Sequence, residues 1–335
     1  MDWLTLEFAW AGLIAFAVLA YVVLDGFDLG IGILFPFMRD AKQRDTMMNS
    51  VAPFWDGNET WLVLGGGGLF AVFPLAYAVV MPALYAPIIA MLLALIFRGV
   101  AFEYRHRTVR AKRVWDWSFH LGSLGAAFAQ GIALGALVQG IPVEGRAYAG
   151  GWWDWLTPFS LLTGAALVIG YTLLGSTWLV MKTEGALRAR AARFARIAGA
   201  GTLALIGAVS LWTPFLEPLY FHRWFDWPTV IFSGLVPLLI LGCAWVLFTG
   251  LARGQDRRPF FAAEAIFVLC FAGIGISFHP YIVPPVLTIE ETAAPDESLL
   301  FLLVGALVLI PIILGYTAYA YWLFRGKTGE DEGYH

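Results

Sequence analysis

The chain has 335 residues, of which 60% are hydrophobic and only 13% are charged, and its mean hydropathy is +0.74. A soluble globular domain carries about a quarter charged residues, so this composition excludes that class and indicates an integral membrane protein. The formal net charge of −3 comes without a basic face, which argues against a nucleic-acid partner.

Nine apolar runs follow one another along the chain, each about 20 residues long or longer, as membrane spanning requires. They lie near residues 6–36, 50–73, 76–97, 118–138, 157–181, 195–215, 229–250, 260–281 and 299–324. Short connections join them, and no soluble domain is inserted. We therefore predict an all-α polytopic membrane protein with nine transmembrane helices in a single domain, 1–335. The first eight spans are expected to form two four-helix bundles, to which the ninth is added.

The basic residues predict the orientation of these spans, because Lys and Arg mark the cytoplasmic loops of membrane proteins. Of the 21 Lys and Arg residues, all except Arg146 and Arg223 fall in the gaps after spans 1, 3, 5 and 7 or after span 9. Arg98 is the first residue of one such gap. The alternation supports nine spans, with the N-terminus on the outer side of the membrane and the C-terminus in the cytoplasm.

Two acidic pairs lie within the first two apolar spans. Asp25 and Asp28 belong to VVLDGFDLGIG, and Asp56 and Glu59 belong to PFWDGNETWLVLGGGG. The i, i+3 spacing places the two carboxyls of each pair on one face of a helix. An acidic side chain inside a membrane costs about 2.5–3.5 kcal/mol on insertion scales, so four of them require a functional explanation.

These four carboxyls are predicted to form one acidic ladder in the cytoplasmic half of the membrane. At about 1.5 Å per residue from the inner helix ends, Asp28 lies roughly 13 Å and Asp56 roughly 9 Å inside, so antiparallel neighbours bring both pairs to overlapping depths. Neither span contains a Lys or Arg. Because burial and like charges disfavour ionised carboxylates, we expect one or two members to be protonated and to relay protons.

Two other roles are open for these acids. They could cap helix breaks or accept hydrogen bonds from Trp and Asn donors, since Gly26, Gly30 and Gly57 beside them favour broken helices. Four carboxylates could also coordinate sodium or calcium. Glu103 and Glu264, at the membrane edge, are interpreted as surface partners of nearby basic residues.

The sequence offers no site for a cofactor held by this chain alone. Haem iron is commonly bound by His or Met, but no pair of buried histidines occurs at a useful depth, and no Walker motif or Cys/His cluster is present. We predict no metal site, so any redox metal would belong to another subunit. Trp55 and Trp61, which flank the acids of span 2, could line an apolar path, stack on a cofactor or pack in the core.

At these motifs the chain resembles subunit II of the cytochrome bd-type quinol oxidases, over essentially its whole length. The resemblance is carried by DGFDLGIG at 25–32, APFWDGNETWLVLGGGGLFAVFPLAYA at 52–78, FRGVAFEYR at 97–105, WDW at 115–117 and LVLIPIILGYTAYAYW at 307–322. The second motif is long and highly specific. The nine spans and the outer N-terminus inferred above agree with this family.

The resemblance implies a subunit of a bacterial inner-membrane complex that oxidises quinol, reduces dioxygen to water and takes up protons from the cytoplasm. The N-terminus would be periplasmic. The implied partner is subunit I, which carries b-type haems and a d-type or additional b-type haem, whereas this chain ligates none. Lipids and a small single-span accessory subunit are further expected partners.

The resemblance also implies roles for single residues. By motif position, Asp25, Asp28 and Asp56 look like the proton-path acids of the family. Trp61 is similar to a tryptophan of the oxygen route, and Arg98 to an arginine near the subunit interface. Glu59 departs from the common pattern, because many members carry Gln there; the GNETW form looks like the cyanide-insensitive oxidase branch. An extra acid could add a proton site or only alter a hydrogen bond.

The leading hypothesis is therefore a subunit of a membrane quinol oxidase that supplies a proton path and takes part in oxygen access. The alternatives are a cation- or proton-coupled secondary transporter with acids near the midplane, and a scaffold for the catalytic subunit. Transporters often repeat discontinuous helices, whereas the acids here lie only in spans 1 and 2. That asymmetry favours a half-channel that ends at a partner.

Overall fold

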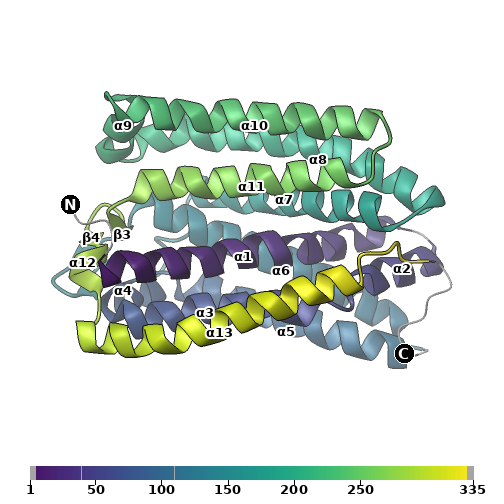
Figure 1. Cartoon of the computed structure of the whole chain (residues 1–335), viewed down its shortest axis with the longest axis horizontal. Coiled ribbons are helices and arrows are strands. Elements are labelled where there is room, and N and C mark those ends of the chain that lie inside the picture. The colour runs from purple at the N-terminus through teal and green to yellow at the C-terminus, as the bar shows by residue number, and fades with distance from the viewer. Residues whose placement is uncertain (1–4, 39, 109, 330–335) are drawn as a thin grey trace.

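The computed structural model describes residues 5–329 except 39 and 109, so the terminal residues and Arg39, one of the basic residues used for the orientation, lie outside the described part. Within it, eight helices are long and apolar enough to cross a membrane. They are α1 (Leu6–Leu34), α5 (Tyr85–Arg107), α6 (Lys112–Gln139), α7 (Pro158–Lys182), α8 (Gly185–Trp212), α10 (Thr229–Ala252), α11 (Arg257–Phe278) and α13 (Asp296–Leu323). Figure 1 shows them side by side along one direction. The predicted all-α polytopic membrane protein is confirmed.

Shorter elements connect these helices. They are η1 (Phe35–Phe37), α2 (Ala41–Val51), α3 (Trp55–Val72), α4 (Pro74–Ala83), η2 (Thr213–Phe215), α9 (Pro218–Phe225) and α12 (Ile289–Thr292). Two antiparallel hairpins pair β1 (Val143–Glu144) with β2 (Ala147–Tyr148) and β3 (Tyr281–Val283) with β4 (Leu287–Thr288). Val143 pairs with Tyr148 in the first, and Tyr281 with Thr288 in the second.

The second and third predicted spans differ from the observed helices. The chain forms α2 before the acids, α3 starts only at Trp55, and the span expected over 76–97 is broken at Leu84 into α4 and α5. Prolines explain the break, because Pro87 has no N–H to bond the carbonyl of Ala83 and is tolerated only in the first turn of a new helix. Pro82 and Pro87 predict a bend in the span over 76–97, and the structure shows a full break between them at Leu84.

The first helix, in contrast, is continuous through its glycines. A Cβ atom at Gly30 would collide with the backbone carbonyl of Tyr171, and one at Gly175 would collide with the backbone of Gly30. The glycines thus let α1 and α7 pack with their backbones in close approach. They do not break the helix, and the expectation of a broken first span is wrong.

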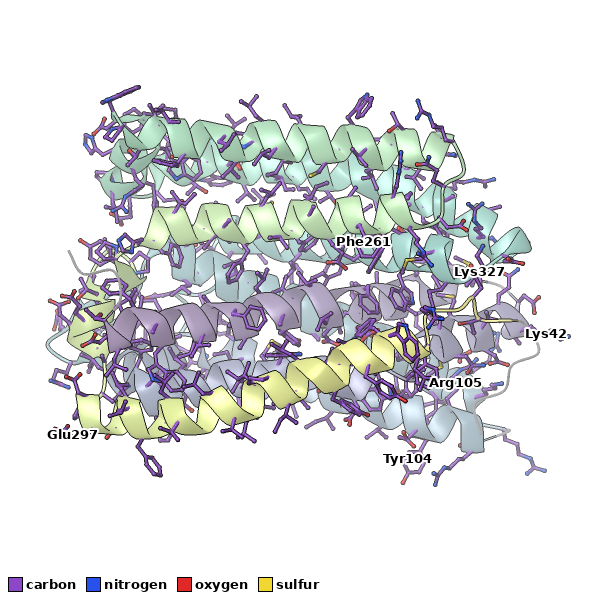
Figure 2. All side chains as sticks on the ribbon, viewed as in Figure 1. Lys42, Tyr104, Arg105, Phe261, Glu297 and Lys327 are labelled. Carbon is purple, nitrogen blue, oxygen red and sulfur yellow. The ribbon has the colours of Figure 1, made fainter. Side chains whose placement is uncertain are left out.

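The helix α1 occupies the centre of the molecule. It contacts α3, α6 and α7, while α5 packs on α6, α8 on α7, and α10 on α11. The last helix, α13, contacts the rest mainly through α1 and α3, which it crosses in Figure 1. The end of the molecule at which Lys42, Arg105 and Lys327 gather is called the basic end below; Glu297 lies at the opposite end (Figure 2).

Candidate functional site

Asp25 and Asp28 lie in the last third of α1, and both side chains are completely buried, with 0% of their surface exposed. They are held there because α1 is covered on several sides by α3, α6 and α7. Burying a carboxylate without a partner costs several kcal/mol. Their surroundings must therefore supply either charge compensation or hydrogen-bond donors.

Arg98 supplies the charge. It projects from α5 with 1% of its side chain exposed, and its Nη2 atom lies 3.2 Å from Oδ1 of Asp25 while its Nη1 atom lies 3.2 Å from Oε2 of Glu59. The sequence places Arg98 in the gap after span 3, which is wrong, because it lies within α5. Neither acidic span contains a Lys or Arg, and the base that faces the acids comes from this third helix. The guanidinium bridges the two acidic pairs and stabilises their ionised forms.

Asn58 supplies the donor for Asp28. Its amide nitrogen lies 2.8 Å from Oδ2 of Asp28 and 3.1 Å from the carbonyl oxygen of Leu24, donating to both. The hydroxyl of Tyr321, on α13, donates in turn to the amide oxygen of Asn58 at 3.0 Å. One polar chain therefore joins α13, α3 and α1. Asn58 and Tyr321 both lie inside the motifs at 52–78 and 307–322, but no local feature of the sequence marks them as site residues.

The second acidic pair lies in a different environment from the first. Asp56 is exposed and falls in the first turn of α3, where a negative charge interacts favourably with the helix N-terminus. The expected depth of Asp56 within its helix is therefore wrong, because α2 takes up the residues counted as its start. The side chain of Glu59 is 30% exposed and faces both Arg98 and the surface. Asp25, Arg98 and Glu59 thus form one ion-paired group, and Asp28 belongs to a separate hydrogen-bonded group with Asn58 and Tyr321.

The two tryptophans of this motif have separate places. Trp61 is 2% exposed and packs between α3 and α1, with its ring edge-on to Phe16 at 5.7 Å. Trp55 stacks on Phe102 at 4.9 Å, and the guanidinium of Arg98 lies 5.9 Å from its ring centre. Trp55 therefore lines the Arg98 site directly, whereas Trp61 lies further along α3.

Glu264 differs most from its expected place. The sequence assigns it to a surface ion pair, but it is 9% exposed, and neither carboxylate oxygen has a hydrogen-bond partner among the described residues. Glu103, its counterpart on α5, is 54% exposed and lies 4.0 Å from Arg107 one turn on. The surface interpretation is thus confirmed for Glu103 and wrong for Glu264.

A second charged cluster closes the basic end. Arg105 of α5 is buried, and its Nη1 and Nε atoms each lie 2.6 Å from a carboxylate oxygen, of Asp45 on α2 and of Asp116 on α6. Lys112 adds a 3.3 Å contact to Asp45. Partial burial opposes ionisation of Asp45, but these two cations outweigh it and hold the pKa of that carboxyl below its usual range. The cluster ties the short helix α2 to α5 and α6.

No metal site is evident in the described residues. They contain no group of three or more His, Cys, Asp or Glu side chains arranged to hold a metal ion. The four acids are divided between the buried part of α1 and the more exposed start of α3, and the guanidinium of Arg98 lies between Asp25 and Glu59. This positive charge disfavours the binding of a metal cation among them. The arrangement can instead hold and exchange protons, because carboxyls of differing burial share one hydrogen-bonded region.

Comparisons with known proteins identify the family. Residues 6–324 match the family model described as cytochrome bd terminal oxidase subunit II. The chain is 30% identical to cytochrome bd-I ubiquinol oxidase subunit 2 of Escherichia coli strain K12, covering 99% of this chain and 97% of that one. It is 29% identical to cytochrome bd ubiquinol oxidase subunit 2 of Bacillus subtilis strain 168, covering 96% and 97%.

A solved structure shares the fold. It is the bd oxidase from Geobacillus thermodenitrificans, one chain of which superposes with a TM-score of 0.75 at 17% identity, covering 96% of this chain and 99% of that one. At this identity the likeness concerns the fold alone. The family-model match and the near full-length relatives go further: this chain belongs to the cytochrome bd terminal oxidase subunit II family.

Proposed function

We propose that this chain assembles with a haem-bearing subunit I into a terminal quinol oxidase of the bacterial inner membrane, and that it supplies a proton path to that subunit. The complex oxidises quinol and reduces dioxygen to water, which consumes protons. The relatives are named as ubiquinol oxidase subunits, and this naming gives no support to the transporter alternative. The haems, of b type and of d type or additional b type in the family, would supply the electron transfer from the partner.

One observation carries the proton path. Asp25 is completely buried, yet Arg98 links it to Glu59, because the guanidinium lies 3.2 Å from a carboxylate oxygen of each residue. The side chain of Glu59 reaches the surface of α3. A membrane protein retains such costly groups where ions or protons move. Arg98 keeps a negative charge stable at either carboxylate. A proton that binds one of the two acids removes the attraction between that carboxyl and the guanidinium, so the proton is readily passed on. Asn58 and Tyr321 hold Asp28 in place beside this pair.

The exposed side of α3 is the surface that we assign to subunit I. It presents Asp56 and part of Glu59, which cannot face lipid without a large cost. The same helix has three glycines, Gly57, Gly66 and Gly67, at which an added Cβ atom would meet nothing within 4 Å. Small residues of this kind let a partner helix approach closely. Gly65 and Gly68, by contrast, face Val18 and Ile14 of α1.

The topology that we propose has nine crossings, with α3 added to the eight long apolar helices, and the basic end in the cytoplasm. The start of α1 and the end of α13 lie at opposite ends of the molecule (Figure 1), which requires an odd number of crossings. The basic end fits the cytoplasm because Lys and Arg are retained there. The N-terminus is then periplasmic, and the chain forms one transmembrane domain with α7, α8, α10 and α11 as one of two bundles.

Two apolar regions of the chain have proposed roles in the complex. Trp61 is buried among apolar side chains between α1 and α3, which supports its proposed place beside an oxygen route. The outward side of α13, whose large side chains such as Phe301 and Tyr316 are mostly exposed, is available to lipids or to a small single-span subunit. The cyanide response and the haem type belong to subunit I.

The decisive experiment is Asp28→Asn in the whole complex. The substitution keeps the shape of the side chain but removes its ability to bind a proton, so we expect oxygen consumption to fall at least about tenfold. The haem spectrum and the subunit content should stay unchanged. Glu103→Gln, at an exposed acid of α5, is the matched control and should leave the rate unaltered. Undiminished oxygen consumption and acidification in an assembled Asp28→Asn complex would refute the proton path.

A further inference from the structure

Glu264 lies on the side of α11 that faces the centre of the molecule. Phe260 and Phe267, one turn before it and one turn after it, mark the same face of the helix. The ring of Phe260 packs edge-on to Phe27 of α1 at 5.7 Å and to Trp178 of α7 at 5.3 Å, and Phe267 stacks on Tyr171 at 5.8 Å. The carboxyl of Glu264 is therefore enclosed between α1, α7 and α11.

No described residue compensates the cost of burying this carboxyl with a hydrogen bond or an opposite charge. Its two oxygens are inaccessible and accept no hydrogen bond from a described residue, and no Lys, Arg or His in that part of the chain forms an ion pair with it. A leucine or glutamine would pack there without the cost of burying an acid. A purely structural role thus gives no reason for Glu at this position, whereas reversible proton binding does.

Glu264 and Asp28 both lie near Tyr321 of α13. Tyr321 donates to Asn58, and Asn58 donates to Asp28. Tyr321 is also near enough to Glu264 to experience its charge, as is Tyr171, whose hydroxyl donates to Gln130 at 2.9 Å. The titratable and charged groups around Glu264 are accordingly Tyr171 on α7, Tyr321 on α13 and, beyond Tyr321, Asp25 and Asp28 on α1.

A cavity of about 320 Å³ opens at the basic end above this tyrosine. Its lining includes the polar side chains of Asn49, Ser50 and Lys182, and the ring of Phe54. Phe54 stacks on Tyr321 with ring centres 4.3 Å apart, so one aromatic pair separates the cavity from the buried polar groups. The space is polar and large enough to hold several water molecules.

We propose that Glu264 is a proton-binding residue of a second intake, which leads from this cavity past Tyr321 to Asp28 and is separate from the Arg98–Glu59 side of the site. The proposal rests on the proposed function, because it adds a source of protons to the same path. The step is a proton exchange without electron transfer. An O–H bond forms at a Glu264 oxygen when a hydronium ion in the cavity gives up a proton and becomes water. That bond breaks as an O–H bond forms at Asp28, with water and the Tyr321 hydroxyl between the two acids.

The test uses infrared difference spectra of the intact complex, recorded between its reduced and oxidised states, together with oxygen consumption. We expect Glu264→Gln to remove one carboxylic-acid C=O band and to slow oxygen consumption about tenfold. Glu103→Gln should retain both. Glu264→Asp, which keeps a titratable group, should restore the rate and shift the band. An assembled Glu264→Gln complex with the wild-type bands and rate would overturn the proposal.

Two further variants separate the possible failures. Tyr321→Phe removes the hydroxyl between the two acids, so it should shift the Glu264 band; an unshifted band also overturns the proposal, even if Glu264→Gln fails to assemble. Asp28→Asn tests the proposed function by itself. If Asp28→Asn stops oxygen consumption while Glu264→Gln does not, only the second intake is wrong, and if neither does, the proton path as a whole is wrong.

Discussion

Arg98 and Arg105 lie on the same face of α5, two helical turns apart, and each binds two carboxylates. Arg105 contacts its partners at 2.6 Å, and these partners, Asp45 and Asp116, are 37% and 15% exposed. Arg98 contacts Asp25 and Glu59 at 3.2 Å, and Asp25 is not exposed at all. Two arginines on one helix thus bind acid pairs that differ in distance and in burial.

The difference separates a structural cluster from a functional one. The short pairs of Arg105 are close to water, so their acids can be hydrated when the arginine is lost, and their geometry is that of strong charge-assisted hydrogen bonds. The longer pairs of Arg98 include the completely buried Asp25, which has no water to take the place of the guanidinium, whereas Glu59 is 30% exposed. Tight pairing serves to hold α2 in place, whereas looser pairing leaves the acids of the buried site able to gain and lose a proton.

Arg98→Met gives the largest expected effect. It leaves Asp25 buried without its cation, which should cost about 3–5 kcal/mol of unfolding free energy. Thermal unfolding of the purified complex measures this loss. The double variant Arg98→Met with Asp25→Asn removes the unpaired charge together with the cation, so it should recover most of the stability. If the double variant is no more stable than the single one, Arg98 does not act on Asp25 in the way described.

Arg105→Met is the matched substitution on the same helix, and its expected cost is smaller, about 1–3 kcal/mol. Asp45 and Asp116 are left near the surface, where water can take the place of the guanidinium. Oxygen consumption per assembled complex should stay at the wild-type level, because this cluster lies outside the proton path. A loss of turnover as large as that expected for Asp28→Asn would remove the distinction between the two arginines.

Hydropathy and charge patterns predict most of this fold. The helix α7 is expected at 157–181 and runs from Pro158 to Lys182, because its apolar run is bounded by a proline and a basic residue. At 76–97 the apolar window alone gives one span, and it is Pro82 and Pro87 that indicate the interruption found at Leu84. The pattern fails for Arg98, which it assigns to a loop because this residue directly follows the apolar run.

The site is only partly predictable. The acids can be predicted as site residues from their cost in a membrane, and Arg98 can be predicted from its motif. The ion pairs between them cannot be predicted in either way. The hydrogen bond from Tyr321 to Asn58 joins residues 263 positions apart, and no local pattern indicates such a contact. The burial of Glu264 is unpredictable for a related reason, because the neighbouring Phe260 on the same face of α11 packs on Phe27 and Trp178, which come from other helices.

The smallest expected effect is the response of the Arg105 cluster to acid. Although partial burial opposes it, the charges of Arg105 and Lys112 lower the pKa of Asp45 in the folded protein, whereas an unfolded Asp titrates near about 3.9. The stabilisation that Asp45 contributes is therefore complete above about pH 5, and it is lost as the pH falls through the lowered pKa of Asp45 in the folded protein. Because Asp45 is more than a third exposed, solvent screening should limit it to less than about 1 kcal/mol.

Hydrogen exchange of the α2 amides between neutral and acidic pH measures this response. Protection of α2 should fall in acid, while that of the buried part of α1 around Asp25 should persist. Asp45→Asn should be equally protected at all pH values, since it has no proton to gain, and Asp40→Asn, at the start of α2, controls for charge at the same helix. If α2 in the wild type keeps full protection in acid, the ion pairs of Asp45 do not hold this helix, and apolar packing of Met47 and Met48 must do so instead.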